Sequence, residues 1–231
     1  EEDEDVYVGN ILNGQRFGSG LCRFANGSIY EGQWQDNKPH GIGTFIYSGN
    51  TGIAIGEWNN GKLEGKGTYK WGDGRIYEGE WSDSKINGTG FYLFANGDTY
   101  EGDFVDNKFH GNGRYSWKRS GNIYEGAWKQ GKRHGRGKEI EVQDNTVYEG
   151  FFIENKRHGK GFYKYDDGIT HTIEFEYGKE KEGSRTFKDP NGTVRENEGG
   201  MHYLRHSTTT RFNDDASANE EKVGTLNSPR V

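Results

Sequence analysis

One segment recurs along this sequence every 23 or 24 residues. Its clearest copies read Tyr-Glu-Gly, then any residue, then Trp or Phe. A fixed period of this length is typical of repeat proteins, so it constrains the fold more than any local pattern does. The copies begin at Tyr7, Tyr30, Ala54, Tyr77, Tyr100, Tyr124, Tyr148 and His171.

This period predicts the organisation of the chain. Residues 1–6 form an acidic lead-in, residues 7–194 form about eight repeats, and residues 195–231 form a tail or docking arm. The eighth repeat is degenerate. The predicted repeat bounds are 7–29, 30–53, 54–76, 77–99, 100–123, 124–147, 148–170 and 171–194.

The composition suits a thin repeated sheet better than a layered globular core. Hydrophobic residues make up only 29% of the chain, yet aromatic residues make up 14% and glycine contributes 38 residues. Disordered chains are poor in aromatic residues, so we expect an ordered structure in which each repeat packs on its neighbours. The net charge of −6 argues against a dedicated nucleic-acid-binding protein.

Each repeat is predicted to be a β-hairpin. In the repeat from Tyr77, Gly79 and Trp81 follow at alternate positions, with glutamates between them, so one face is aromatic and the other is charged. A turn is expected over Ser82 to Ile86. Glycines weaken strands, and we expect aromatic rings from neighbouring strands to lie across them. The predicted fold is all-β: an elongated single-layer antiparallel sheet of tandem β-hairpins with a C-terminal irregular tail.

The repeat from Tyr124 breaks the aromatic pattern. Glu139 and Glu141 fall where aromatic residues stand in other repeats, and carboxylates on an aromatic face would be costly. A one-residue bulge in the second strand is therefore predicted, which would return Ile140 and Val142 to that face.

A second motif, His-Gly-x-Gly, follows a lysine in the best repeats, at His40, His110, His134 and His158. Together with the Tyr-Glu-Gly motif, this pattern resembles the MORN repeat. The resemblance implies a non-catalytic scaffold or connector, similar to axonemal radial-spoke MORN proteins, with protein partners in a cytoskeletal assembly of a cilium or flagellum. The chain departs from the family pattern at its ends, with Ile11 at the Trp position and Ile173 at the glycine position.

A single-layer sheet has no second layer, so part of its aromatic face is expected to remain accessible as a groove for a protein segment. The segment would be residues 195–231 of this chain or part of a neighbouring subunit, which makes self-association one alternative. The residues expected to line the partner-binding groove are Trp58, Trp81, Phe104, Trp128 and Phe152.

Cations recur at one position of the repeat and predict a basic edge on the hairpin ends. This edge would set the orientation and association rate of a protein partner. An alternative function follows from the same residues: a peripheral membrane–cytoskeleton tether that binds anionic phospholipids. A third interpretation is that the cations only keep the edge soluble. The residues proposed for the basic edge are Lys108, Lys132, Arg133, Lys156 and Arg157.

Nothing in the sequence predicts an enzyme, a cofactor or a metal site. The repeated histidines would lie on successive hairpins about 10 Å apart, too far to converge on one ion. Every candidate catalytic residue is explained by its place in the repeat. The single cysteine, Cys22, and the lack of a secretory leader predict a reducing, cytosolic compartment. The resemblance to the MORN repeat implies a cytoskeletal location within it.

Overall fold

The computed structural model describes residues 4–196, which are built from β-strands and one short 3-10 helix, η1 (Ser48–Asn50). This part of the chain falls into two compact units. The first contains residues 4–95 and Phe104–Asn107; the second contains Asn96–Asp103 and residues 108–196.

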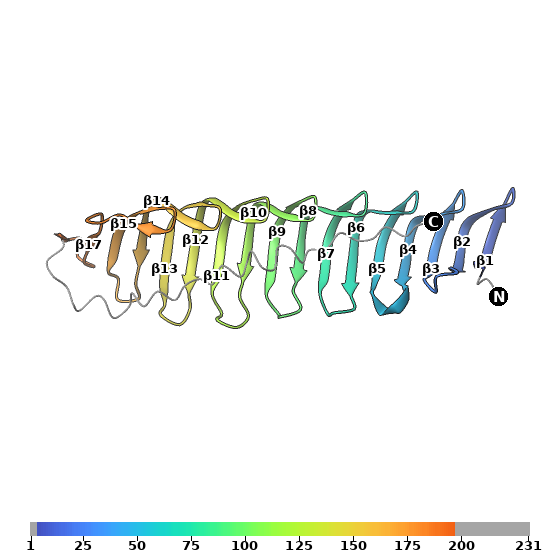
Figure 1. Cartoon of the computed structure of the whole chain (residues 1–231), viewed down its shortest axis with the longest axis horizontal. Coiled ribbons are helices and arrows are strands. Elements are labelled where there is room, and N and C mark those ends of the chain that lie inside the picture. The colour runs from blue at the N-terminus through green and yellow to red at the C-terminus, as the bar shows by residue number, and fades with distance from the viewer. Residues whose placement is uncertain (1–3, 197–231) are drawn as a thin grey trace. The chain divides into compact units, whose positions relative to one another are not determined.

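In the first unit, the strands follow one another in chain order, and each pairs antiparallel with the next (Figure 1). The strands are β1 (Val6–Leu12), β2 (Gln15–Arg23), β3 (Ile29–Gln35), β4 (Lys38–Tyr47), β5 (Gly52–Asn59), β6 (Lys62–Trp71), β7 (Ile76–Ser82) and β8 (Lys85–Leu93).

The second unit repeats this arrangement from β10 to β15, again as successive antiparallel pairs. The degenerate eighth repeat lacks a full second strand, and β15 pairs instead with both β16 and β17. The strands are β9 (Thr99–Val105), β10 (Lys108–Ser116), β11 (Ile123–Lys129), β12 (Lys132–Glu141), β13 (Thr146–Ile153), β14 (Lys156–Lys164), β15 (Thr170–Glu176), β16 (Lys179–Glu180), β17 (Thr186–Lys188) and β18 (Val194–Glu196).

The turn inside each hairpin is tighter than expected. In the hairpin of β7 and β8, only Asp83 and Ser84 lie between the strands, and both have positive φ, +55° and +60°. Two consecutive residues with positive φ make a type I′ turn, whose twist matches that of the strands. The predicted turn over Ser82 to Ile86 is therefore wrong in its extent, and the second strand begins at Lys85.

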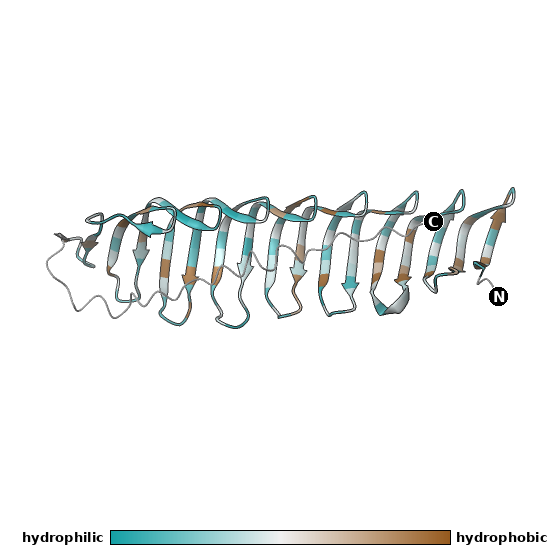
Figure 2. Ribbon diagram, in the orientation of Figure 1, coloured by the Kyte–Doolittle hydropathy of each residue, from teal (hydrophilic) through white to brown (hydrophobic). Residues whose placement is uncertain are grey.

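The two faces of each hairpin differ as the alternation predicts, and Figure 2 shows apolar and polar residues interspersed along the strands. Tyr77 and Trp81 are buried while Glu78 is exposed. Gly79 pairs with Gly90, and the Tyr77 ring covers this pair so closely that a Cβ on either glycine would clash with it. The Tyr77 hydroxyl donates to the Glu80 carbonyl at 3.0 Å. The predicted cover by a ring of a neighbouring strand is therefore confirmed for Gly90, whereas Gly79 is covered by a ring of its own strand.

Neighbouring hairpins are joined by reciprocal hydrogen bonds at the type I′ turns. The Asn107 N–H donates to the Ile86 carbonyl at 2.9 Å, and the Asn107 side-chain oxygen accepts from the Ile86 N–H at 2.8 Å. Asn37 and Asn155 make the same pair of bonds with Arg16 and Arg133. In each case the bonds satisfy the backbone N–H and carbonyl of the second residue in the second strand of the preceding hairpin. Because they connect one hairpin to the next, they also fix the spacing of the hairpins.

These observations confirm the predicted fold class, an all-β single-layer antiparallel sheet of tandem hairpins, for each unit. Most of the tail predicted for residues 195–231 lies outside the described residues; β18 is its only described element.

Candidate functional site

The five aromatic residues predicted to line an accessible groove are instead buried. Trp58 and Trp81 are each 3% exposed, and the other three are 2% exposed or less. The Trp58 ring packs edge-on against Tyr30, with ring centroids 5.5 Å apart, and its Nε1–H donates to the Gly43 carbonyl at 3.1 Å. The expectation of accessible anchors is wrong for Trp58, Trp81, Phe104, Trp128 and Phe152, because these rings fill the space between the tyrosines of adjacent repeats.

A different aromatic row reaches the surface, at the end of the second strand of each hairpin. Trp71 in the first unit is partly exposed and packs against Tyr69 at 4.6 Å and Tyr92 at 5.4 Å. Trp117 occupies the same position in the second unit and packs against Tyr115 at 4.6 Å. This row, called here the rim row, consists of the partly exposed residues Phe24, Tyr47, Trp71, Trp117 and Tyr165.

The sequence contains a signal for the rim row. The rim residues recur with the same period as the buried row, but they stand at the last position of the second strand or directly after it, and they are partly exposed. Two members of the series differ: Phe94 is buried, 3% exposed, and Glu141 replaces the aromatic ring in β12.

The lysines of the predicted basic edge stand directly after the type I′ turns and contact the turn of the next repeat. Lys85 Nζ lies 2.9 Å from Asp106, and Lys62 pairs with Asp83. Lys132 lies 3.6 Å from Glu154, while Lys108 donates to Gln130 at 3.2 Å. Lys156 is exposed at the equivalent position. Cations therefore alternate with acidic or amide groups along these turns, which reduces the net positive charge that the edge presents.

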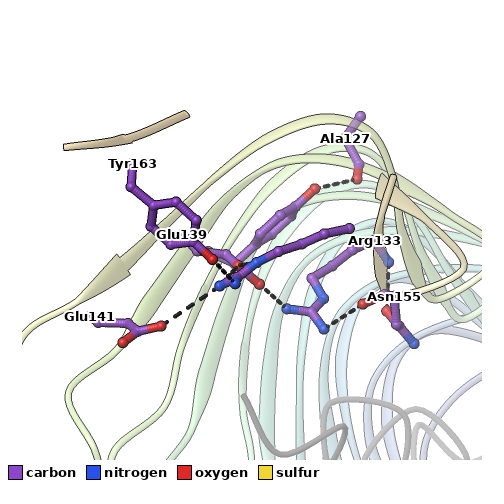
Figure 3. A network of polar contacts seen from close by, with 8 residues as sticks. Ala127, Arg133, Glu139, Glu141, Asn155 and Tyr163 are labelled. Atoms are coloured by element: carbon purple, nitrogen blue, oxygen red, sulfur yellow. Dashed lines mark hydrogen bonds and ion pairs between the residues drawn. The ribbon is translucent and has the colours of Figure 1, made fainter. Parts of the chain in front are cut away.

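The two arginines assigned to this edge point into the core. The Arg133 side chain is 3% exposed, and its Nη1 donates to Glu139 at 2.6 Å. Arg157 donates to the other Glu139 oxygen through Nε at 2.7 Å and also contacts the Tyr163 hydroxyl. Figure 3 shows Glu139 beside Arg133 and Tyr163, with the Asn155 carbonyl accepting from Arg133. The prediction that Arg133 and Arg157 contribute to a basic edge is wrong.

The same network corrects the prediction for Glu139. Its side chain is 2% exposed and lies on the aromatic face, opposite Tyr124 and Tyr148. No register shift separates it from Tyr148 along β12 and β13, and Val142 is 52% exposed. The second-strand bulge is therefore absent from this pair of strands. The carboxylate is tolerated because two guanidinium groups bind it directly, which compensates for the loss of water.

Glu141 lies at the margin of this cluster, where the rim row is interrupted. Its carboxylate is 3.7 Å from Arg157 Nη2. Burial raises the pKa of the Glu141 carboxyl to about 7, and Arg157 opposes that shift. Glu139 is close enough to raise this pKa further by repulsion. The group therefore changes protonation near neutral pH.

The repeated histidines do not form a metal centre in the described part of the chain. Within residues 4–196, no three His, Cys, Asp or Glu side chains gather in a way that could hold a metal ion. His158 instead accepts a hydrogen bond from the Tyr177 N–H at 3.3 Å through Nδ1. The same residues contain no helix long and apolar enough to cross a membrane.

The family model of the MORN repeat matches the chain at residues 7–29, 30–51, 55–74, 77–99, 100–121, 124–140 and 148–170. This chain belongs to the MORN repeat family. MORN repeats suggest a protein-binding scaffold, and membership is consistent with a non-enzymatic role. The matched segments coincide with the first seven hairpins. A search of curated proteins found no relative.

Solved structures with a similar chain trace include domains of centriole proteins. The SAS-4 (dCPAP) TCP domain of Drosophila melanogaster, in complex with a proline-rich motif of Ana2, is 15% identical over 83% of this chain and 88% of its own, with a TM-score of 0.34. A TCP10 domain of Danio rerio CPAP is 13% identical over 77% of this chain and 86% of its own, with a TM-score of 0.31. The CPAP G-box domain is 9% identical over 79% of this chain and 88% of its own, with a TM-score of 0.33. At these scores the likeness carries no argument about function.

Proposed function

We propose that this MORN repeat chain is a non-catalytic scaffold that binds protein partners through its rim row. The observation that carries the proposal is the partial exposure of Phe24, Tyr47 and Trp71 in the first unit and of Trp117 and Tyr165 in the second. Aromatic side chains with one covered and one open side are favoured contact residues in protein interfaces.

The rim rings are also held in place before a partner arrives. Trp71 packs between Tyr69 and Tyr92, and the Arg75 guanidinium lies 5.0 Å from its ring centroid. A ring that is already fixed loses little conformational entropy on binding, so less of the binding free energy is lost in ordering it. The lysines near the type I′ turns are largely engaged with neighbouring turns, which favours protein contacts over a lipid tether.

A capture experiment from ciliated cells tests this proposal. Wild-type protein, Trp71→Ala and Trp117→Ala are compared with the matched controls Lys70→Ala and Ser116→Ala, which change the adjacent residue on the opposite face. Melting curves establish that each variant is folded. We expect the tryptophan variants to lose partners that the controls retain. Equal recovery from all four folded variants would contradict the proposal.

The finer proposal is that the assembly is cytoskeletal and belongs to the axoneme of a cilium or flagellum, for example a radial spoke. It rests on what membership of the MORN repeat family implies, because the family includes axonemal radial-spoke components. In detergent-extracted ciliated cells, the tagged chain should remain with the axoneme. Its release with the soluble fraction would exclude this placement while leaving the scaffold proposal intact.

A further inference from the structure

The outer face of the sheet, opposite the aromatic core, contains a position that five repeats fill and two do not. In each hairpin, the first glycine of the second strand has positive φ, as at Gly111 (+53°). In the first five repeats, a polar side chain from the first strand covers this glycine, so that an added Cβ would contact it. The covering residues are Asn10, Gln33, Glu57, Glu80 and Asp103.

In three of these repeats, the covering side chain binds a donor of the second strand. Asp103 accepts from the Asn112 N–H at 2.8 Å, and Gln33 accepts from the Ile42 N–H at 3.1 Å. Glu80 accepts from the Thr89 hydroxyl at 2.9 Å. These three repeats thus supply their own carboxylate or amide oxygen to the donors beside the glycine. These contacts show how an acidic side chain binds at this position.

The repeats from Tyr124 and Tyr148 carry no such acceptor. Ala127 and Phe151 stand at the covering position, and neither side chain can accept a hydrogen bond. A Cβ on Gly135 would meet only the Ala127 Cβ, at 3.3 Å, among the described residues. A Cβ on Gly159 would meet no described atom within 4 Å. The two positions are therefore open on the outer face of β12 and β14.

Cations and exposed phenylalanines surround these two positions. Four cations lie on this face, and none of them forms an ion pair within 4.0 Å inside residues 4–196: Arg136, Lys138, Lys160 and Lys164. Lys138 and Lys160 stand opposite Glu149 and Glu174 across the strands, whereas Arg136 stands opposite Phe151. Phe151 is 46% exposed, Phe162 is 41% exposed, and the Arg136 guanidinium lies 5.7 Å from the Phe151 ring. Phe151 pairs with Arg136 across β12 and β13, and Phe162 pairs with Glu149 across β13 and β14.

We propose that this face of β12, β13 and β14 binds an acidic, partly apolar segment of a partner protein. Aspartate or glutamate side chains of the partner occupy the open positions at Gly135 and Gly159, as Asp103 does at Gly111. Arg136 and Lys160 bind their charge, and an apolar partner residue packs on Phe151 and Phe162. The two positions lie two strands apart, about 10 Å, which suits carboxylates on one short segment.

This inference rests on the proposal that the chain binds proteins, but it uses a face separate from the rim row. The intramolecular ligands of the other repeats are side chains of neighbouring strands, so a protein carboxylate fits the position better than a lipid phosphate does. The exposed phenylalanines add an apolar contact that a free anion does not use.

Fluorescence anisotropy with a labelled peptide of mixed Glu and Leu residues tests the inference on the full chain. A second peptide has Gln in place of every Glu. The decisive variants, Ala127→Asp and Phe151→Glu, restore the acceptor that earlier repeats possess and so compete with the peptide. We expect the Glu/Leu peptide to bind the wild type, and each variant to weaken binding about tenfold, the loss of one charge-assisted hydrogen bond.

Two matched variants separate a specific site from general attraction. Arg136→Glu and Lys66→Glu make the same change in charge at equivalent positions, but Glu57 already covers Gly65 beside Lys66. Only Arg136→Glu should weaken binding. Equal weakening by both, or equal binding of the Gln peptide, would overturn the proposal. Binding to phosphatidylserine vesicles but not to the peptide would also overturn it, and would assign the face to a membrane. Partner capture through Trp71 and Trp117 would be unaffected, so the two proposals fail separately.

Discussion

Glu139→Ala should be strongly destabilising, because the Glu139 carboxylate is the charge partner of two core arginines. The Arg133 side chain is 3% exposed, and that of Arg157 is 22% exposed. Removing one member of a buried ion pair costs about 3–5 kcal/mol of unfolding free energy, since the remaining charge is left uncompensated. For a chain of this size, each 1 kcal/mol lowers the melting temperature by about 2–4 °C. We therefore expect a decrease of about 6–20 °C in differential scanning calorimetry.

The matched control replaces the whole cluster with the residues that the first unit uses at the same positions. Arg133→Leu, Glu139→Tyr and Arg157→Ile together follow the pattern of Leu63, Tyr69 and Ile86. Exchanging a buried ion triad for packed apolar residues is neutral or stabilising by about 1–4 kcal/mol. A loss below about 1 kcal/mol for Glu139→Ala would refute the reasoning, because it would mean that the arginines reach water unaided.

Three further predictions concern single positions. Glu141→Gln should stabilise the protein above pH 7 and change its stability little below pH 4.5. The pKa of the Glu141 carboxyl in the folded protein, about 7, exceeds its ordinary value of 4.5, so wild-type stability falls as the pH rises between these values. Melting temperatures measured across this pH range check the sign. Gly102→Val should lower the free energy of unfolding by about 3 kcal/mol or more, because the valine Cβ would lie 2.5 Å from backbone atoms of β10. Its control, Glu101→Ala at an exposed position, should change that free energy by no more than about 0.5 kcal/mol. Urea unfolding measures both values. Asn107→Gly keeps the positive φ but removes the acceptor of the Ile86 N–H, so we expect a loss of about 1 kcal/mol and faster amide exchange at Ile86; unchanged exchange would contradict it.

The period of the sequence was sufficient to predict the hairpins and the alternation of their faces. Tyr77, Gly79 and Trp81 lie on one face because strand geometry has a period of two, and that holds whatever the rest of the sheet does. The tight turns could also have been predicted, since Asn13-Gly14 and Asn60-Gly61 are typical type I′ pairs.

Exposure could not be predicted from the period, because it depends on how neighbouring rings share space. Trp81 and Trp71 are both aromatic and both periodic, but only Trp71 stands at the end of a strand with one side open. The buried charge was misinterpreted for a similar reason. The cost of burying Glu139 depends on its partners, and the arginines that replace apolar residues at positions 133 and 157 are the signal in the sequence that this charge is compensated.

Several side chains that join neighbouring hairpins reach back along the chain. Asn107 and Asn155 reach back to the hairpin that precedes them, and Trp34, Trp58 and Trp81 donate their indole N–H to a glycine carbonyl of the preceding hairpin. A ribosome releases these hairpins in the same order. Each new hairpin therefore finds the backbone partners of these side chains already in place, at a sequence separation of only 14 to 22 residues. Folding during synthesis can then advance one hairpin at a time without waiting for the C-terminus.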